Sequence, residues 1–412
     1  MSESNIILIL GAGEGQVPLI LRAKEAGWYT VVVSPQGQYP GFELADRCCY
    51  LDISDAEAIL GLAREMKVKA IATDQTDISM PTVVTVAKEL GLPCIDCENI
   101  YHFQFKSLMR EICYRQGIAT IVFCVTDKLE EAQAFFLSIP NGKAIVKPVD
   151  SQGSRGIHKV CSSDGIPDAF ASALKYSRSG RVIIEQFIDG HEIEVDTAMK
   201  DGKTVCTLIG DVYNFGFEDT FSAYERIYPA RMEPELEKKV RAYNESVLQA
   251  LGLTTGWTHG EYIVTEEGDV YLLEVGLRGG GNFIGSDILR DRIGVGTDEM
   301  AFLTATGDDS FYERMGPREG HCAYKCFYLP EGEVKTVDID EGLLNRPFVL
   351  RHNLDGLCVG RQISKATDKT SRYTVVVKAE TTDELRSILD DIENRIHVGV
   401  LTASGMQGAI WK

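Results

Sequence analysis

The sequence predicts a multidomain protein of mixed class, with an α/β fold at the N-terminus and an α+β fold at the C-terminus. The chain has 412 residues, and single hydrophobic cores stop growing at about 250–300 residues. Strand-like and helix-like segments alternate over roughly the first 97 residues, which is typical of a doubly wound sheet. β-rich segments and one helix follow residue 319. We therefore expect two or three domains.

The N-terminal segments appear in a regular order. The apolar run Ile6–Leu10 is typical of a parallel strand buried on both faces. A helix is expected over Val17–Ala26, because Gly27 interrupts its apolar periodicity. A second strand is expected over Tyr29–Val33, and a further strand and helix over 70–73 and 81–90. This alternation predicts a small Rossmann-like domain over residues 1–97.

A glycine-rich loop follows the first strand, with glycines at 11, 13 and 15. A dinucleotide-binding loop requires its third glycine where this chain has Gln16, and an acidic residue after the second strand, where this chain has Ser34 and Pro35. A nicotinamide site is therefore disfavoured. The loop is interpreted as a tight turn between strand and helix, or as a contact to a small substrate.

The charge balance limits the partners. The chain has 61 acidic and 42 basic residues, a net charge of -19, whereas nucleic acids and anionic membranes attract basic surfaces. No apolar run approaches the ~20 residues needed to cross a bilayer. The chain has 11 cysteines and no export signal, which favours reduced thiols and a cytoplasmic location. The Cys94–Cys97 pair leaves a redox or metal site as a minor alternative.

Further along the chain the pattern of elements changes. A helix is expected over 106–115, and a long amphipathic helix after Pro234 that Gly252 ends. Strands over 144–146 and 181–188 flank a second glycine-rich loop. The last part contains strands over 323–329 and 373–379 and a helix over 383–392.

A hairpin between Gly260 and Gly276 is the most informative motif. A turn centred on Glu267–Gly268 pairs Glu261 with Glu274, and places Ile263 opposite Leu272. Like charges directly opposite one another are destabilising. Two carboxylates among apolar residues therefore need a cation, and Mg²⁺ is the cation that carboxylates and substrate phosphates bind together. The alternative is an exposed acidic pair at a sheet edge.

A second motif joins a lysine to a glycine-rich loop. The strand Ala144–Pro148 places Lys147 among apolar residues, and the loop Ser151–Gly156 follows. Small residues allow backbone N–H groups to approach a phosphate closely, and Lys147 would neutralise its charge. The alternative is a flexible surface loop. The motif GxxxxGK[ST] is absent from the sequence, so a P-loop nucleotidase is excluded.

A third motif, Val182–Asp196, predicts a strand, a turn and a second strand. Phe187 and Ile188 would form an apolar slot for a purine. Glu192 would accept hydrogen bonds from ribose hydroxyls. An acidic hairpin on the surface is the alternative explanation.

In this order the motifs resemble the ATP-grasp superfamily, specifically the branch that contains biotin carboxylase, carbamoyl phosphate synthetase, purine-biosynthetic carboxylases and L-amino-acid ligases. The resemblance implies that Arg278 and Lys147 are catalytic and that Glu261 and Glu274 bind Mg²⁺, with Mn²⁺ as an alternative. The ATP-binding residues that it implies are Lys106, Lys147, Gly153, Ser154, Gly156, Glu185, Gln186, Phe187, Ile188 and Glu192.

The resemblance also implies three domains. They are a pre-ATP-grasp domain over 1–97, an ATP-grasp domain over 98–318 with a lid near 120–188, and a small α+β domain over 319–412. Segments 325–334, 355–360 and 373–384 look like the last domain of the L-amino-acid ligases.

One position departs from the family pattern. The family usually has an asparagine as a further metal ligand two residues after the second glutamate, where this chain has Gly276. We expect a water molecule to replace the amide oxygen, since Mg²⁺ commonly keeps several waters. On that hypothesis Gly276→Asn changes activity by less than about tenfold, roughly 1.4 kcal/mol.

The resemblance implies an ATP- and Mg²⁺-dependent ligase that joins a small carboxylate, such as an amino acid, to an amine through an acyl phosphate. A carboxylase or a carbamoyl-phosphate-synthetase-like enzyme acting through carboxyphosphate, and a non-catalytic ATP-binding sensor, are the alternatives. A homodimer is left open. Candidate acceptor contacts in the segment Asp211–Arg231 are Asn214, Tyr224, Glu225 and Arg226.

Overall fold

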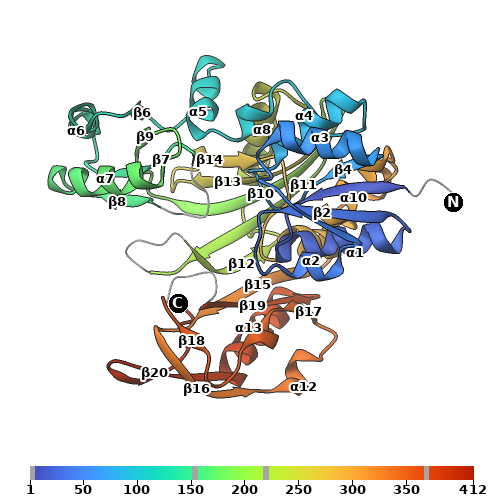
Figure 1. Ribbon diagram of the computed structural model, residues 1–412. Coiled ribbons are helices and arrows are strands. Elements are labelled where there is room, and N and C mark those ends of the chain that lie inside the picture. Colours follow the sequence, from blue (N-terminus) through green and yellow to red (C-terminus); the bar gives the residue numbers. More distant parts are fainter. Residues whose placement is uncertain (1–4, 151–155, 217–221, 366–370) are drawn as a thin grey trace.

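The computed structural model describes residues 5–150, 156–216, 222–365 and 371–412. Figure 1 shows the N-terminal elements on one side of a large central sheet, a small sheet with two helices on the opposite side, and the C-terminal elements below. The strands of the described residues form four sheets. This arrangement confirms the multidomain α/β and α+β class.

The N-terminal sheet has the order β3-β2-β1-β4, and its neighbouring strands are parallel. Its strands are β1 (Ile6–Leu10), β2 (Tyr29–Ser34), β3 (Arg47–Tyr50) and β4 (Ala70–Ala72). Its helices are α1 (Val17–Glu25), α2 (Pro40–Leu44), α3 (Ala56–Met66) and α4 (Met80–Leu90). In such folds, ligands bind outside the carboxyl ends of the strands where the strand order reverses. The loops after β1 and β4 lie at that edge.

The central sheet has nine strands, and those that pair along it are antiparallel. They are β5 (Asp96–Cys97), β10 (His191–Lys200), β11 (Lys203–Asn214), β12 (Ala223–Tyr228), β13 (Leu253–Val264), β14 (Val270–Gly276), β15 (His321–Tyr328), β17 (Val349–His352) and β19 (Arg372–Ala379). The predicted helices are α5 (Lys106–Arg115) and α8 (Pro234–Ala250). α8 buries Val240, Val247 and Leu248 in the main core.

The predicted lid region forms a sheet of its own. The sheet has the order β6-β9-β7-β8. Its strands are β6 (Phe123–Thr126), β7 (Ala144–Pro148), β8 (His158–Val160) and β9 (Val182–Gln186). Helices α6 (Leu129–Ser138) and α7 (Ile166–Tyr176) contribute Phe136 and Phe170 to a core that is separate from the main one. A small sheet with its own core can move as a unit relative to the central sheet.

The C-terminal residues are divided between two sheets. β16 (Gly332–Ile339), β18 (Gln362–Ile363), β20 (Ile396–Thr402) and β21 (Gly405–Gln407) form a small sheet, and α13 (Thr382–Arg395) contacts both β19 and β20. β15, however, pairs with β12, so the central sheet continues past residue 318. The division of the chain at 97 and 318 therefore remains a prediction, and the second boundary crosses hydrogen-bonded strands.

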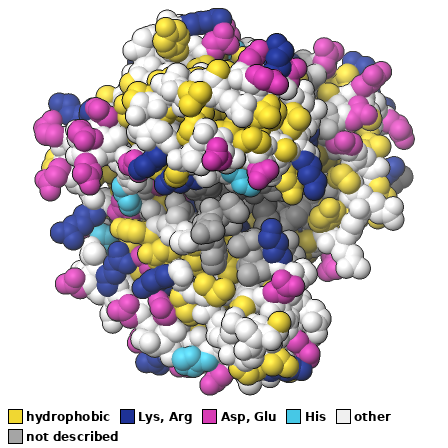
Figure 2. Space-filling view, turned by 90° about the vertical axis from the view of Figure 1, so that its left-hand side faces the viewer, with side chains coloured by type: hydrophobic (Ala, Val, Ile, Leu, Met, Phe, Trp, Pro, Cys, Tyr) yellow, Lys and Arg dark blue, Asp and Glu magenta, His cyan; other side chains and the backbone are white. Residues whose placement is uncertain are grey.

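Short helices connect these parts: α9 (Leu289–Ile293), α10 (Thr297–Thr306), α11 (Phe311–Arg314) and α12 (Glu341–Leu344). Within the described ranges, every helix is too short or too polar to cross a bilayer. Figure 2 shows acidic and basic side chains interspersed over one face of the molecule.

Candidate active site

A cavity of about 350 Å³ collects most of the predicted site residues. Those that line it are Lys106, Lys147, Glu185, Gln186, Phe187, Ile188, Glu192, Glu261, Glu274 and Arg278. They come from α5, β7, β9, β10, β13, β14 and the segments that follow β9 and β14. The cavity thus lies between the lid sheet and the central sheet, and its lining residues come from segments between Lys106 and Arg278.

The structure describes only part of the predicted glycine-rich loop Ser151–Gly156. Gly153 and Ser154 lie outside the described residues. Gly156 has a φ of 72°, and a Cβ atom there would lie 2.9 Å from the Tyr176 ring, closer than real contacts. Gly156 therefore meets a local backbone and packing requirement where the loop joins the lid sheet.

The hairpin confirms the central pairing and corrects the register beside it. Glu261 pairs with Glu274, as predicted. Ile263, however, pairs with Tyr271 rather than Leu272, because the register shifts by one residue between Glu261 and Tyr262. The shift leaves Leu273 as an extra residue, a β-bulge that re-aims the side chains beside it.

This bulge explains why Leu272 and Glu274, two residues apart on β14, do not share one environment. In an unbroken strand, Leu272 and Glu274 would face the same side of the sheet. Leu272 is buried in the main core, whereas Glu274 lines the cavity. The carbonyl of Leu273, freed from the ladder, accepts a hydrogen bond of 2.7 Å from Arg110 Nη2. The bulge therefore turns Glu274 toward Glu261 while Leu272 stays in the core.

The two glutamates have different electrostatic environments. Burial, and then the charge of Glu274, raise the pKa of Glu261. Burial also disfavours the charged form of Glu274, but the ammonium group of Lys106 forms an ion pair with it and lowers its pKa on balance. We call Glu261, Glu274 and Lys106 the open cluster. It contains one more carboxylate than ammonium group.

Lys147 is held in place by Glu185, a contact that the sequence did not predict. Its Nζ lies 2.6 Å from Glu185 Oε2, and Arg110 Nε lies 2.9 Å from Glu185 Oε1. Burial lowers the pKa of Lys147, and Glu185 opposes this effect. The side chain of Glu185 thus positions two cations. Arg110 could have been found from sequence, because it is one helical turn after Lys106 on the same face.

The residues predicted to bind the nucleoside line the same cavity. Phe187 and Ile188 line it directly after β9, and Lys159 Nζ lies 3.7 Å from the centre of the Phe187 ring. Glu192 Oε2 accepts a hydrogen bond of 2.5 Å from Asn214 Nδ2. Asn214, a candidate acceptor contact, therefore holds Glu192 in place.

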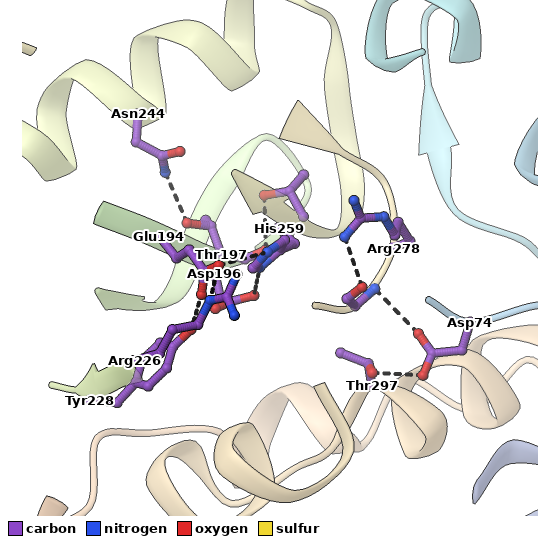
Figure 3. A network of polar contacts seen from close by, with 12 residues as sticks. Asp74, Glu194, Asp196, Thr197, Arg226, Tyr228, Asn244, His259, Arg278 and Thr297 are labelled. Atoms are coloured by element: carbon purple, nitrogen blue, oxygen red, sulfur yellow. Dashed lines mark hydrogen bonds and ion pairs between the residues drawn. The ribbon is translucent and has the colours of Figure 1, made fainter. Parts of the chain in front are cut away.

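A second acidic group lies deeper in the central sheet (Figure 3). Glu194 accepts hydrogen bonds from Arg226 Nε, at 2.5 Å, and from the Tyr228 hydroxyl. Asp196 lies 2.8 Å from Nδ1 of His259. Burial disfavours the charged form of His259, but Asp196 and Glu194 raise its pKa. We call these five residues the closed cluster, because Arg226 and His259 pair with its two carboxylates.

Potential metal ligands are found in both clusters. Ligand atoms of Glu194, His259 and Glu261 lie within 4.8 Å of one another. Glu194 and His259 already have protein partners, whereas Glu261 has no basic side chain within ion-pair distance among the described residues. The open cluster is therefore the better candidate for a cation.

Arg278 is contacted from the N-terminal domain. Its Nε lies 3.0 Å from each carboxylate oxygen of Asp77, and its Nη1 donates to the carbonyl of Gly279 at 3.1 Å. Asp74 accepts hydrogen bonds from the backbone of Gly279 and the hydroxyl of Thr297, at 3.2 and 2.7 Å (Figure 3). Burial raises the pKa of Asp74 to about 7. The segment after β4 therefore contacts the segment after β14 at two points.

Comparisons with known proteins bear on this geometry. Residues 125–280 match the family model described as D-ala D-ala ligase C-terminus. The solved L-amino acid ligase from Bacillus licheniformis superimposes with a TM-score of 0.80 and 20% identity, over 97% of this chain and 99% of that chain. The chain has the ATP-grasp fold.

The curated relatives match shorter parts of the chain. D-alanine–D-alanine ligase from Geotalea uraniireducens is 33% identical over 156 residues, which is 37% of this chain and 48% of that protein. Formate-dependent phosphoribosylglycinamide formyltransferase from Methanocella arvoryzae is 24% identical over 66% of each chain. The chain therefore spans about half to two thirds of the length of these relatives.

A larger cavity of about 550 Å³ adjoins the cavity of about 350 Å³, which we call the ATP-grasp cavity. Both cavities are lined by Asp77, Lys106, Glu274 and Arg278. The larger one extends toward the aromatic residues Phe103, Phe105 and Tyr176. Glu274 and the three residues near it thus line both cavities.

The other candidate acceptor contacts lie on opposite faces of β12. Arg226 lines the ATP-grasp cavity. Glu225 instead pairs with Lys325 and Arg386, at 3.1 and 2.6 Å, where the C-terminal elements pack. Tyr224 lies 5.3 Å from the Lys325 ammonium, measured to the ring centre.

Asp77 was not predicted from the sequence. The one sequence feature that could have indicated it is its position after a parallel strand.

Proposed function

We propose that this chain is an ATP- and Mg²⁺-dependent carboxylate–amine ligase that forms an amide through an acyl phosphate. One observation carries the proposal. Lys106, Lys147, Glu261, Glu274 and Arg278, which come from separate elements, line a single cavity. Cations for phosphate and paired carboxylates for a metal are the groups that phosphoryl transfer requires.

The chemistry of the donor set fits a magnesium ion. Glu261 and Glu274 are directly paired, and only one of them has an ammonium partner among the described residues. Mg²⁺ prefers carboxylate and phosphate oxygens, and Mn²⁺ would accept the same ligands. When bound, the ion would neutralise charge on the β- and γ-phosphates. Lys106 would then be released from Glu274 to contact a phosphate.

The remaining site residues support nucleotide binding. Phe187 and Ile188 would cover the purine, and Glu192 would accept hydrogen bonds from the ribose. Lys147 is buried and fixed by Glu185, so it is preorganised to contact a phosphate oxygen without a reorganisation cost. Gly156 is a proposed phosphate contact, as are Gly153 and Ser154, which lie outside the described residues.

In the proposed reaction the substrate carboxylate attacks the γ-phosphorus of ATP, and ADP leaves. Lys147 and Arg278 offset the charge that develops on the transferred phosphoryl group. The amine then attacks the acyl carbon, phosphate leaves, and the nitrogen loses a proton. Exclusion of water by the lid would protect the acyl phosphate from hydrolysis.

The similarity to a D-alanine–D-alanine ligase and to an L-amino acid ligase favours an amino acid among the substrates. A second candidate is a carboxylase acting through carboxyphosphate. It is supported by the solved biotin carboxylase domain from Hydrogenobacter thermophilus, bound to MgADP and bicarbonate, which superimposes over 98% of this chain with a TM-score of 0.74 and 17% identity.

We also propose a cytoplasmic location, because the 11 cysteines of the chain favour a compartment in which thiols stay reduced.

The test is a screen of ADP release against panels of carboxylates and amines. A ligase should release ADP only with its carboxylate, yield a hydroxamate when hydroxylamine is present, and produce an amide when its amine is added. ADP release that depends on bicarbonate would favour the carboxylase. Tight ATP binding without ADP release across a broad panel would favour a sensor.

A further inference from the structure

Gly276 lies close to Asp77, a residue that is distant from it in sequence. The glycine ends β14, two residues before Arg278. A Cβ atom on residue 276 would lie 2.3 Å from Oδ1 of Asp77, and 3.3 Å from Cγ and Nε of Arg278. Real Cβ atoms essentially never approach another atom within 3.0 Å. Any side chain at 276 therefore has to displace Asp77.

Asp77 holds one edge of the Arg278 guanidinium group. Both of its carboxylate oxygens lie 3.0 Å from Nε, and the Gly279 carbonyl accepts from Nη1 at 3.1 Å. Two contacts on different nitrogens fix the plane of the group. Neither contact uses Nη2, so within the described part of the chain this nitrogen is left for an anionic ligand.

The charges around Arg278 show why a separate carboxylate is needed. Burial disfavours the charged form of Arg278, but the charges of Asp77, Glu274 and Glu261 oppose this effect and raise its pKa on balance. Arg278 lines the same cavity as the two glutamates that we propose as metal ligands. Asp77 therefore supplies Arg278 with a carboxylate partner other than these two.

Asp77 is itself held in place by its own segment. Asp74, three residues earlier, is buried and accepts hydrogen bonds from Gln75 N, Gly279 N and the hydroxyl of Thr297, at 2.8, 3.2 and 2.7 Å. These bonds join the loop after β4 to the segment after β14. The position of Asp77 relative to Arg278 is thus set by the packing of the N-terminal domain.

We propose that Asp77 is a positioning residue for Arg278, and that Gly276 is required because it makes room for Asp77. This deepens the proposed function and rests on it. It replaces the expectation that Gly276 is a tolerated variation in which a water molecule stands in for an amide. On this proposal the N-terminal domain is part of the phosphoryl-transfer site.

The test measures the dissociation constants of MgATP and MgADP for the full chain, because a contact to the γ-phosphate appears as a preference for ATP. Asp77→Ala should lower this preference by roughly tenfold or more, the range expected for losing one charged hydrogen bond. Asp77→Asn keeps the shape and should lower it in the same direction. Asp77→Glu should restore part of it.

A double-mutant cycle tests the role of the glycine. Gly276→Ala should lower the preference for ATP as Asp77→Ala does, because the added methyl group expels the carboxylate. In the Asp77→Ala background, Gly276→Ala should have almost no further effect, because nothing remains to be displaced. Independent, additive effects of the two substitutions would overturn the proposal.

Two controls separate positioning from general loss of structure. Asp55→Ala removes the cap at the start of α3, where Asp55 accepts from Ala58 N at 3.0 Å. It should lower the Tm of the same domain without changing the preference for ATP. Gly61→Ala adds a Cβ atom in open space inside α3, so it should raise the Tm slightly, since alanine favours the helix, and leave the preference for ATP unchanged.

The outcomes also separate this inference from the proposed function. A wild-type protein that prefers MgATP, with Asp77 variants that keep the preference, overturns the inference alone. A wild-type protein that binds no MgATP overturns both. The cycle remains decisive if no carboxylate substrate is found, because it uses only the two nucleotides.

Discussion

The open and closed clusters lie on adjoining strands of one sheet, yet their charges are neutralised in different ways. In the closed cluster, two carboxylates meet the guanidinium of Arg226 and an imidazole whose pKa is raised by them. In the open cluster, Lys106 pairs with Glu274 alone, and Glu261 has no basic partner among the described residues. The carboxylates of the closed cluster are buried, whereas the side chain of Glu274 is 28% exposed. Its exposure and the uncompensated charge together leave room for a cation from outside.

The largest expected effect is on the stability provided by the closed cluster. Glu194→Gln removes the partner of the buried Arg226 and should lower the free energy of unfolding by about 3–5 kcal/mol. Urea unfolding measures the change. Glu237→Gln breaks an exposed helical ion pair with Arg241 and serves as the control, with an expected loss of about 0.5 kcal/mol or less. Equal losses in the two variants would show that the closed cluster is not a stabilising network.

The same substitution in the open cluster should affect activity instead. Glu274→Gln should lower turnover by at least ~10²-fold, typical of losing one electrostatic element of an active site. Its stability should change little, because the substitution also removes the repulsion from Glu261. Glu266→Gln, at an exposed position of the same hairpin, is the matched control. Turnover close to wild type in a folded Glu274→Gln protein would contradict the metal assignment.

A smaller effect is expected for the lysine that Glu185 positions. Lys147→Met keeps the aliphatic stem and removes the charge, so MgATP affinity should fall about tenfold, roughly 1.4 kcal/mol. The fold should persist, because Glu185 retains its contact with Arg110. Calorimetry measures the affinity, and Lys143→Met tests a more exposed lysine one residue before the same strand. Unchanged affinity would remove Lys147 from the phosphate site.

The smallest effect is a pH dependence of stability to which the open cluster should contribute. Burial, followed by Glu274, raises the pKa of Glu261 above its ordinary value of 4.5. The unfolded chain then loses this proton first as pH rises. Without metal, stability should therefore fall between the ordinary pKa and the raised one, by at most ~1.4 kcal/mol per pH unit.

Urea midpoints measured between pH 5 and 8 would detect this slope. Glu261→Gln should flatten it, and saturating MgATP should do the same, because a bound cation removes the penalty for the charged form. A slope that survives in Glu261→Gln would assign the effect to another carboxyl group.

Local patterns predicted much of the chain. The apolar run at Ile6–Leu10, the periodicity of α8 and the start of α5 at Lys106 were all confirmed. These features follow from the local conformational preferences of the residues and from the periodic spacing of apolar side chains along a single helix or strand. The pairing of Glu261 with Glu274 was also confirmed, but the turn alone does not produce it: the strands beside the turn pair one residue away from the predicted register, and the bulge at Leu273 restores the glutamate pair.

Other features depend on residues that are distant in sequence. The bulge at Leu273 is stabilised by Arg110, 163 positions away, and the ion pair of Arg278 crosses 201 positions to Asp77. No local pattern carries such contacts, because they arise only when separate elements pack against one another. The sequence by itself thus determined which residue types the site contains. The tertiary structure decided which partners neutralise their charges and how their side chains are oriented, since electrostatic energy depends on distances that folding alone sets.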